Sequence, residues 1–198
     1  MTVAAAVLAA GRGSRLGAPA AVKPLLEYRG RPLVAWALDA AVASGLGPVL
    51  LVVGHGGDEV AHVADDLDGV TVVPAPDWAD GISQSLRAAL EALTSDLSVD
   101  AVCVGLADQP RVGAEAYRRV AAATEAGAAL AVATYDGRRA NPVALARPLW
   151  SAARALTGDA GARQLMDGSE VEVDCTGTGD PADVDTLDDL RSLEENPP

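Results

Sequence analysis

The sequence predicts an α/β protein, a single three-layer α/β/α domain built on a mostly parallel sheet. Short runs rich in valine and alanine alternate with longer amphipathic segments, and this pattern is typical of strands joined by crossover helices on both faces of a sheet. A length of 198 residues suits one domain. We predict the domain over residues 1–193 and expect residues 194–198, which end in two prolines, to be a frayed tail.

The predicted elements follow one another along the chain. In an open sheet of this kind, ligands bind beyond the carboxyl ends of the strands, so the loops at 9–23, 54–57, 74–83 and 105–111 are expected to form the site. The expected strands lie at 2–10, 48–54, 70–74, 100–108, 129–137, 142–146 and 171–174. The expected helices lie at 32–44, 58–67, 82–93, 114–127, 147–156, 160–166 and 184–195.

The composition limits the kinds of partner. With 28 acidic and 15 basic side chains the net charge is -13, which repels nucleic acid and anionic membrane surfaces. The N-terminal run has no basic start and is shorter than the ~20 apolar residues that span a bilayer, so we expect a strand there and a cytoplasmic protein. Cys103 and Cys175 fit no metal-ligand spacing and are expected to be reduced and structural.

Residues 8–26 combine glycines with three cations and no acid. Because the rest of the chain is acidic, the grouping of Arg12, Arg15 and Lys23 indicates a site for a small anion. A dinucleotide fingerprint fails because Leu16 stands where the third glycine should fall, and a P-loop fails because Ala-Pro follows the last glycine. The remaining interpretation is a nest of backbone N–H groups with mobile cations around a triphosphate.

This loop and the residues after it resemble a known signature. The segments LAAGRGSRLG and PLLEYRGRPLV are similar to the signature of the MobA-like nucleotidyltransferase family, particularly the molybdenum cofactor cytidylyltransferases. In those relatives the lysine usually follows the proline directly, whereas residues 20–22 precede Lys23 here; its flexible stem still allows it to reach phosphate. The resemblance implies a Rossmann-like, GT-A type nucleotidyltransferase fold. It continues in family order through GISQSLRAAL, LADQP, NPV, GDAGAR and DVDTLDDL.

Nucleotidyl transfer requires charge neutralisation and orientation more than covalent catalysis. Mg²⁺, the cofactor that the resemblance implies, prefers one or two carboxylates together with phosphate oxygens and water. Asp108 follows an apolar strand, so we expect its carboxylate at the ligand edge as a metal ligand; a helix-capping or turn residue is the alternative. Asp183 or Asp185 would be the second ligand, and one of them would be only a helix N-cap. The sequence does not decide between these two.

The resemblance also implies how the nucleotide is held. Arg15 and Lys23 would stabilise the triphosphate, so they join Asp108 as expected catalytic residues. The main chain of Leu8, Ala9 and Ala10 would read the base edge, and the methyl group of Ala10 would narrow the pocket against a purine. Ser83 and Ser85 open a helix, where a plain cap is the alternative to nucleotide contact. The residues expected to hold the nucleotide are Leu8, Ala9, Ala10, Gly11, Gly13 and Ser85.

The acceptor is expected beside residues 141–143 and 158–163. Arg163 would pair with the phosphate of molybdopterin, or it is a solvated helix arginine. His55 and His62 have no acid or cysteine at ligand spacing, and we interpret both as structural or peripheral.

The predicted reaction is Mg²⁺-dependent transfer of CMP from CTP to molybdopterin with release of pyrophosphate. A phosphate acceptor is already anionic near neutral pH, so no general base is needed. One alternative is an NAD(P)-linked oxidoreductase of the nicotine blue type, a label that some relatives carry, although the missing third glycine argues against it. Another is a nucleotide-binding module without catalysis, which the altered spacing before Lys23 favours. Oligomeric state does not follow from the sequence.

Overall fold

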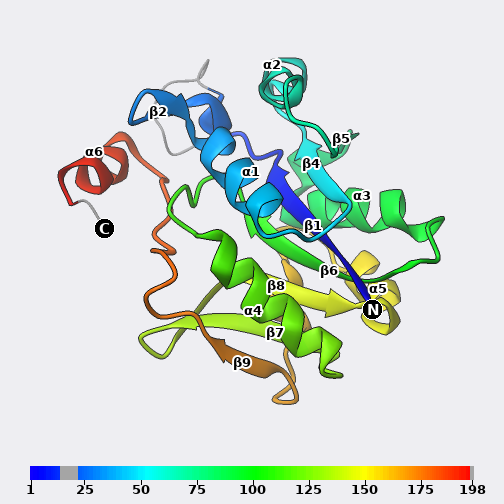
Figure 1. Ribbon diagram of the computed structural model, residues 1–198. Helices are drawn as coiled ribbons and strands as arrows, with labels where there is room; N and C mark the ends of the chain where they lie inside the picture. Colours follow the sequence, from blue (N-terminus) through cyan, green and yellow to red (C-terminus); the bar gives the residue numbers. More distant parts are fainter. Residues whose placement is uncertain (14–21, 197–198) are drawn as a thin grey trace.

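The computed structural model describes residues 1–13 and 22–196 and has one large sheet between helices (Figure 1). Its strands follow the order β5-β4-β1-β6-β8-β7-β9. β8 runs antiparallel to both of its neighbours, whereas the other neighbouring pairs are parallel, so the predicted mostly parallel sheet is confirmed. The strands are β1 (Thr2–Ala9), β4 (Val49–Val53), β5 (Val70–Pro74), β6 (Val99–Leu106), β7 (Leu130–Tyr135), β8 (Arg138–Ala146) and β9 (Val171–Asp174).

Helices cover both faces of the sheet. Successive residues of β1 enter different cores, with Val7 on the face of α1, α2 and α4 and Leu8 on the face of α3 and α5, because strand side chains alternate between faces. Figure 1 shows α1 and α4 crossing the sheet on the same side. The predicted three layers are therefore present. The helices are α1 (Leu33–Ala43), α2 (Gly57–Ala61), α3 (Ile82–Thr94), α4 (Ala114–Glu125), α5 (Trp150–Arg154) and α6 (Leu187–Glu195).

The order of the strands places a switch in direction at β1. From β1 the chain moves outward through β4 to β5 and then returns to add β6 on the other side of β1. Ligands bind at such switch points in open α/β sheets, beyond the carboxyl ends of the strands. The loops that follow β1 and β6 therefore meet at the expected edge.

The second half of the sheet differs from the predicted elements. β7 and β8 form a hairpin across Asp136 and Gly137, whose φ angles are 49° and 75°, as a two-residue type I′ turn requires. β8 consequently begins at Arg138, four residues before the predicted strand at 142–146. A second, unpredicted hairpin joins the short strands β2 (Glu27–Tyr28) and β3 (Arg31–Pro32).

Three predicted helices are shorter or tighter than expected. The segment 58–67 contains α2 followed by a 3₁₀ helix, η3 (His62–Ala64), and 147–156 contains the 3₁₀ helix η5 (Arg147–Leu149) followed by α5. The segment 160–166 forms only the 3₁₀ helix η6 (Ala162–Leu165). No helix among residues 1–13 and 22–196 is long and apolar enough to cross a membrane.

The last helix packs against elements that are distant from it in sequence. α6 lies against β2 and the start of α1 through a small cluster that includes Tyr28, Leu33 and Leu193. It extends to Glu195, two residues past the domain boundary that we predicted. The guanidinium of Arg111, in the loop after β6, donates to the carbonyl oxygens of Leu193 (3.2 Å) and Asn196 (2.5 Å). These contacts fix the C-terminal helix to the functional edge of the sheet.

Candidate active site

One cation and two carboxylates meet at the β1–β6 edge. Lys23 begins a 3₁₀ helix, η2 (Lys23–Leu25), and is only 9% exposed. Its Nζ lies 2.6 Å from Asp108 Oδ2 and 2.7 Å from Asp185 Oδ1. Lys23 is also the only lysine in the chain. Residue 22, the last of the three extra residues, packs its side chain close to Gly56, and the lysine that follows it reaches the sheet edge.

The path of the chain before α6 explains how Asp185 reaches Asp108. The segment around residues 179–185 runs beside the loop after β6, with Asp180 N donating to Arg111 O (3.0 Å) and Val184 N donating to Asp108 O (2.9 Å). These main-chain bonds set the register of the two segments. Asp185 thereby shares Lys23 with Asp108.

Asp183 has a different partner. Gln109, which is 3% exposed, donates from Nε2 to Asp183 Oδ1 (2.6 Å) and to Pro181 O (2.8 Å). The amide oxygen of Gln109 accepts from Asn141 Nδ2 (3.1 Å). A buried amide with all these partners orients its neighbours, so Gln109 links Asp183 to the wall of a cavity on β8.

The electrostatics of these groups follow from burial and proximity. Burial alone would lower the pKa of Lys23, but the charges and hydrogen bonds of Asp108 and Asp185 outweigh it and raise the pKa. Burial and the nearby charge of Asp108 raise the pKa of Asp183. The ammonium of Lys23 is therefore held charged between two carboxylates.

The donor set fits a hard divalent cation. Asp108 Oδ1 is buried and has no hydrogen-bond partner among the described residues, so one carboxylate oxygen is available while the other holds Lys23. No group of three or more acidic, histidine or cysteine side chains in the described part of the chain is arranged to hold a metal. Mg²⁺ needs only one or two carboxylates when phosphates and water complete its shell, so Asp108 and Asp185 suit a metal that arrives with a nucleotide.

Three adjoining cavities surround this cluster. The Trp78 cavity, of about 430 Å³, has Ala10, Gly11, Trp78 and Ser85 in its walls. The Lys23 cavity, of about 370 Å³, is lined by residues that include Ala9, Gly11, Gly13, Lys23, Asp108 and Asp185. The Asn141 cavity, of about 290 Å³, is lined by residues that include Val104, Gln109, Asn141, Asp159, Arg163 and Asp183.

Trp78 forms an aromatic wall of its cavity, and the close packing of Gly54 leaves room for its ring. The Arg12 guanidinium lies 5.6 Å from the centroid of the Trp78 ring system, and the His55 ring lies 5.2 Å from it. A methyl group on Gly54 would lie 2.6 Å from Trp78 Cγ and 2.7 Å from the methyl carbon of Ala10. Ala10 lines the cavity but is only 2% exposed. Its methyl group therefore influences the shape of this wall by its position close to Gly54.

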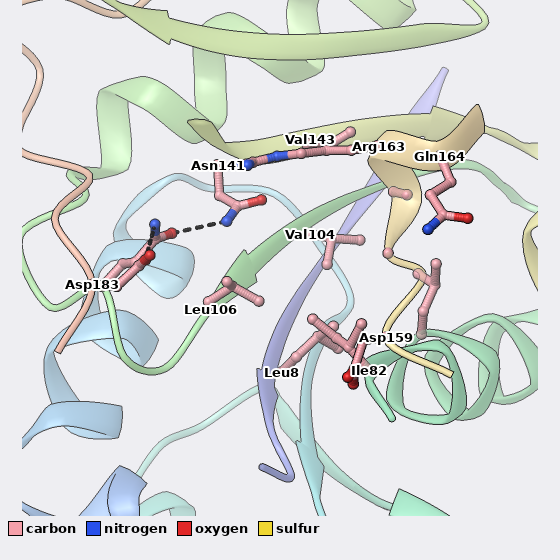
Figure 2. Close-up of a pocket in the computed structure, with 14 residues that line it drawn as sticks. Leu8, Ile82, Val104, Leu106, Asn141, Val143, Asp159, Arg163, Gln164 and Asp183 are labelled. Carbon is pink, nitrogen blue, oxygen red and sulfur yellow. Dashed lines mark hydrogen bonds between the residues drawn. The ribbon is translucent and has the colours of Figure 1, made fainter. Parts of the chain in front are cut away.

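The Asn141 cavity combines an apolar side with a polar rim. Figure 2 shows Leu8 and Ile82 on one side, and the hydrogen bonds that join Asn141 and Asp183 through Gln109 on the other. The side chain of Arg163 extends toward Asn141. This cavity adjoins the cluster of Lys23, Asp108 and Asp185. That position suits a second substrate that must react with the first.

Most of the residues expected at the site lie at this edge. Leu8 lines all three cavities, and Ser85 is 5% exposed in the wall of the Trp78 cavity, whereas Ser83 is fully buried. Arg15 lies outside the described residues. Sequence reasoning gave Gln109 no role, although it directly follows Asp108. It placed Asp159 only as part of the expected acceptor segment 158–163, without a role of its own.

These observations agree with the comparisons with known proteins. A model of the MobA-like NTP transferase domain matches residues 5–173. The chain belongs to this family. By family and fold the MobA-like chain is a nucleotidyltransferase.

Relatives of the MobA-like chain carry more than one activity in their names. Nicotine blue oxidoreductase from Paenarthrobacter nicotinovorans is 31% identical over 201 residues, which cover 96% of each chain. The bifunctional protein GlmU of Sorangium cellulosum is 30% identical over 159 residues, or 78% of this chain and 33% of GlmU. The chain thus spans about a third of that relative's length.

Solved structures cover the chain from end to end. Rv0371c from Mycobacterium tuberculosis H37Rv is 32% identical, with a TM-score of 0.80 over 99% of both chains. A complex of Rv0371c with manganese is 30% identical, with a TM-score of 0.77 over 100% of both chains. A divalent metal is thus present in a relative of the same fold.

Proposed function

We propose that the MobA-like chain transfers CMP from CTP to a phosphorylated acceptor, molybdopterin, and releases pyrophosphate. The observation that carries the proposal is the Lys23, Asp108 and Asp185 cluster, which lies at the switch point of the sheet beside the glycine loop. A positive charge and oxygen ligands at one edge are the groups that phosphoryl chemistry needs. The cavities on either side offer room for two substrates.

The roles follow from the chemistry of each group. A phosphate oxygen of the acceptor attacks the α-phosphorus of CTP, the bond to the β-phosphate oxygen breaks, and pyrophosphate leaves. Lys23, and Arg15 by the family resemblance, would bind the triphosphate, with the main chain at Gly11 and Gly13 turned toward it. Asp108 and Asp185 would hold Mg²⁺, which when bound neutralises phosphate charge.

Further observations support the choice of CTP and of molybdopterin. The LAAG sequence resembles the cytidylyl members of the family, and the Ala10, Gly54 and Trp78 contacts limit the space at the base end of the Trp78 cavity. Arg163 in the Asn141 cavity offers a charge for the acceptor's phosphate. Cys103 and Cys175 are free thiols, which suits the reducing cytoplasm.

A pyrophosphate-release assay tests the proposal. The protein is incubated with Mg²⁺, each of CTP, GTP, ATP and UTP in turn, and molybdopterin as the acceptor. We expect release with CTP and only with the acceptor present. Release with another nucleotide would replace CTP in the proposal, and no release with any nucleotide and this acceptor would overturn it.

A second candidate is supported by the relative from Paenarthrobacter nicotinovorans, whose name gives an oxidoreductase activity and whose length the chain matches. It predicts oxidation of NADH or NADPH in the presence of a candidate dye. Following nicotinamide absorbance with and without such a dye separates the two functions. The third glycine of a dinucleotide fingerprint would fall at position 16, where this chain has Leu16, and this argues for the transferase.

A further inference from the structure

Asp159 occupies a junction that the proposed reaction leaves unexplained. It lies in the loop between α5 and η6 and lines all three cavities. Figure 2 shows it beside Leu8 and Ile82, across the Asn141 cavity from Asn141. A carboxylate repels phosphate groups because both are negatively charged. We therefore expect Asp159 to contact a part of the ligand other than its phosphates.

The position of Asp159 is set by close packing of its loop on α3. A methyl group on Gly81 would lie 2.3 Å from the carbonyl oxygen of Gly158 and 2.8 Å from Asp159 N. Gly81 and Gly158 have φ angles of 107° and 63°, values that glycine adopts readily. Ser83 N also donates to Gly158 O (3.2 Å). The N-terminus of α3 thus fixes the loop that carries Asp159.

The carboxylate of Asp159 is free to accept hydrogen bonds. It makes no hydrogen bond or ion pair with the described residues, in contrast to Asp108 and Asp183, which hold Lys23 and Gln109. An ionised carboxylate is an acceptor only, with two oxygens that can take neighbouring donors. Hydroxyl and amide groups of a ligand can supply such donors.

The order of the cavities identifies those donors. The Trp78 cavity and the Lys23 cavity share four lining residues, Leu8, Gly11, Asp108 and Asp159. A nucleotide with its base in the first cavity and its phosphates in the second places the ribose between them. Of the two side chains there that can accept hydrogen bonds, Asp108 holds Lys23 through Oδ2 and its other oxygen, Oδ1, is the proposed metal ligand, which leaves Asp159.

We propose that Asp159 binds the 2′- and 3′-hydroxyl groups of the nucleotide's ribose, and thereby selects ribonucleotides over deoxyribonucleotides. The inference rests on the proposed function in one respect, that a nucleoside triphosphate binds at this edge. It does not depend on which base or which acceptor is used. Hydrogen bonds to a charged carboxylate are stronger than neutral ones, so the selection should appear in binding as well as in turnover.

Calorimetric titration with CTP and with 2′,3′-dideoxy-CTP, each with Mg²⁺, tests the inference. We expect the wild-type protein to bind CTP at least about tenfold more tightly than the dideoxy analogue, the factor that hydrogen bonds to a charged group supply. Asp159→Ala should bind both nucleotides with the affinity that the wild-type protein has for dideoxy-CTP. Asp66→Asn, at an exposed site in the loop before β5, is the matched control for the lost charge and should keep the preference.

Each outcome is decisive. Equal affinity of the wild-type protein for the two nucleotides, or an equal loss of both in Asp159→Ala, would overturn the role in ribose binding. An effect of Asp159→Ala confined to the KM of the acceptor would assign the residue to the acceptor instead. If CTP fails to bind while another nucleoside triphosphate binds, that nucleotide and its dideoxy analogue replace the pair. If none of CTP, GTP, ATP and UTP binds, the proposed function is overturned together with this inference.

Discussion

Replacing Lys23 with methionine should destabilise the fold by about 2 to 3 kcal/mol. The lysine side chain is 11% exposed, and those of Asp108 and Asp185 are 24% and 38% exposed. Removing one partner of a fully buried pair costs about 3 to 5 kcal/mol, whereas an exposed pair contributes about 0 to 1 kcal/mol. The cluster lies between these limits, because its carboxylates keep part of their contact with water.

Urea denaturation, monitored by tryptophan fluorescence, measures this loss of stability. Lys23→Arg keeps the charge and should lose less stability than Lys23→Met. In the double variant Lys23→Met with Asp185→Asn, one of the two orphaned charges is gone, so the two effects should couple by about 1 kcal/mol or more. A loss below about 0.5 kcal/mol for Lys23→Met, the usual range for surface substitutions, together with no coupling, would refute the argument.

The same variants carry a signature in pH. The pKa of Lys23 is raised from its ordinary 10.5, so its contribution is fully present below pH 10.5 and is lost as the pH rises through the folded value above it. Lys23→Met should lack this alkaline loss. Since Lys23 is the only lysine and the tyrosines are common to both proteins, the difference between the two pH profiles reports on this one group.

Three further substitutions probe the site. Asp108→Asn should lower kcat at least about 100-fold with the fold intact, because groups that stabilise transition-state charge have effects of that size; near-normal turnover would exclude the proposed role. Asp183→Asn should raise the free energy of unfolding at pH 7 by up to roughly 1 kcal/mol. The pKa of Asp183 is raised above its ordinary value of 3.8, so this gain in stability should vanish as the pH falls toward 3.8. A gain that does not depend on pH in urea melts would contradict this expectation. Gly54→Ala should cost about 1 to 3 kcal/mol by overpacking against Trp78 and weaken nucleotide binding in calorimetry, whereas wild-type stability would show that the wall yields.

The fold was readable from the sequence because buried parallel strands and crossover helices leave a strong periodic pattern. The turn at Asp136 and Gly137 also left a signal, since an Asp-Gly pair between apolar runs favours a hairpin, and attention to it would have placed the start of β8 correctly. The helix predicted at 160–166 failed because Gly158 and Gly161 confine that stretch to a loop and a single 3₁₀ turn.

The site was only partly predictable. Asp108 follows a strong strand, so its place at the edge could be predicted from local sequence. The choice between Asp183 and Asp185 depends on the register of one segment against another about 75 residues away, set by the bond from Val184 N to Asp108 O. No local pattern encodes that register, and the position of Asp159 likewise depends on the packing of its loop against Gly81.

The carboxylate cluster joins parts of the chain that are made at very different times. Lys23 and Asp185 are 162 positions apart, so a ribosome at about 5 to 20 residues per second needs on the order of 10 seconds or more to synthesise the chain between them. Until Asp185 emerges and pairs, the growing chain holds the first strand, the glycine loop and Lys23 without a complete centre. The proposed nucleotide chemistry therefore requires synthesis of the chain at least as far as Asp185.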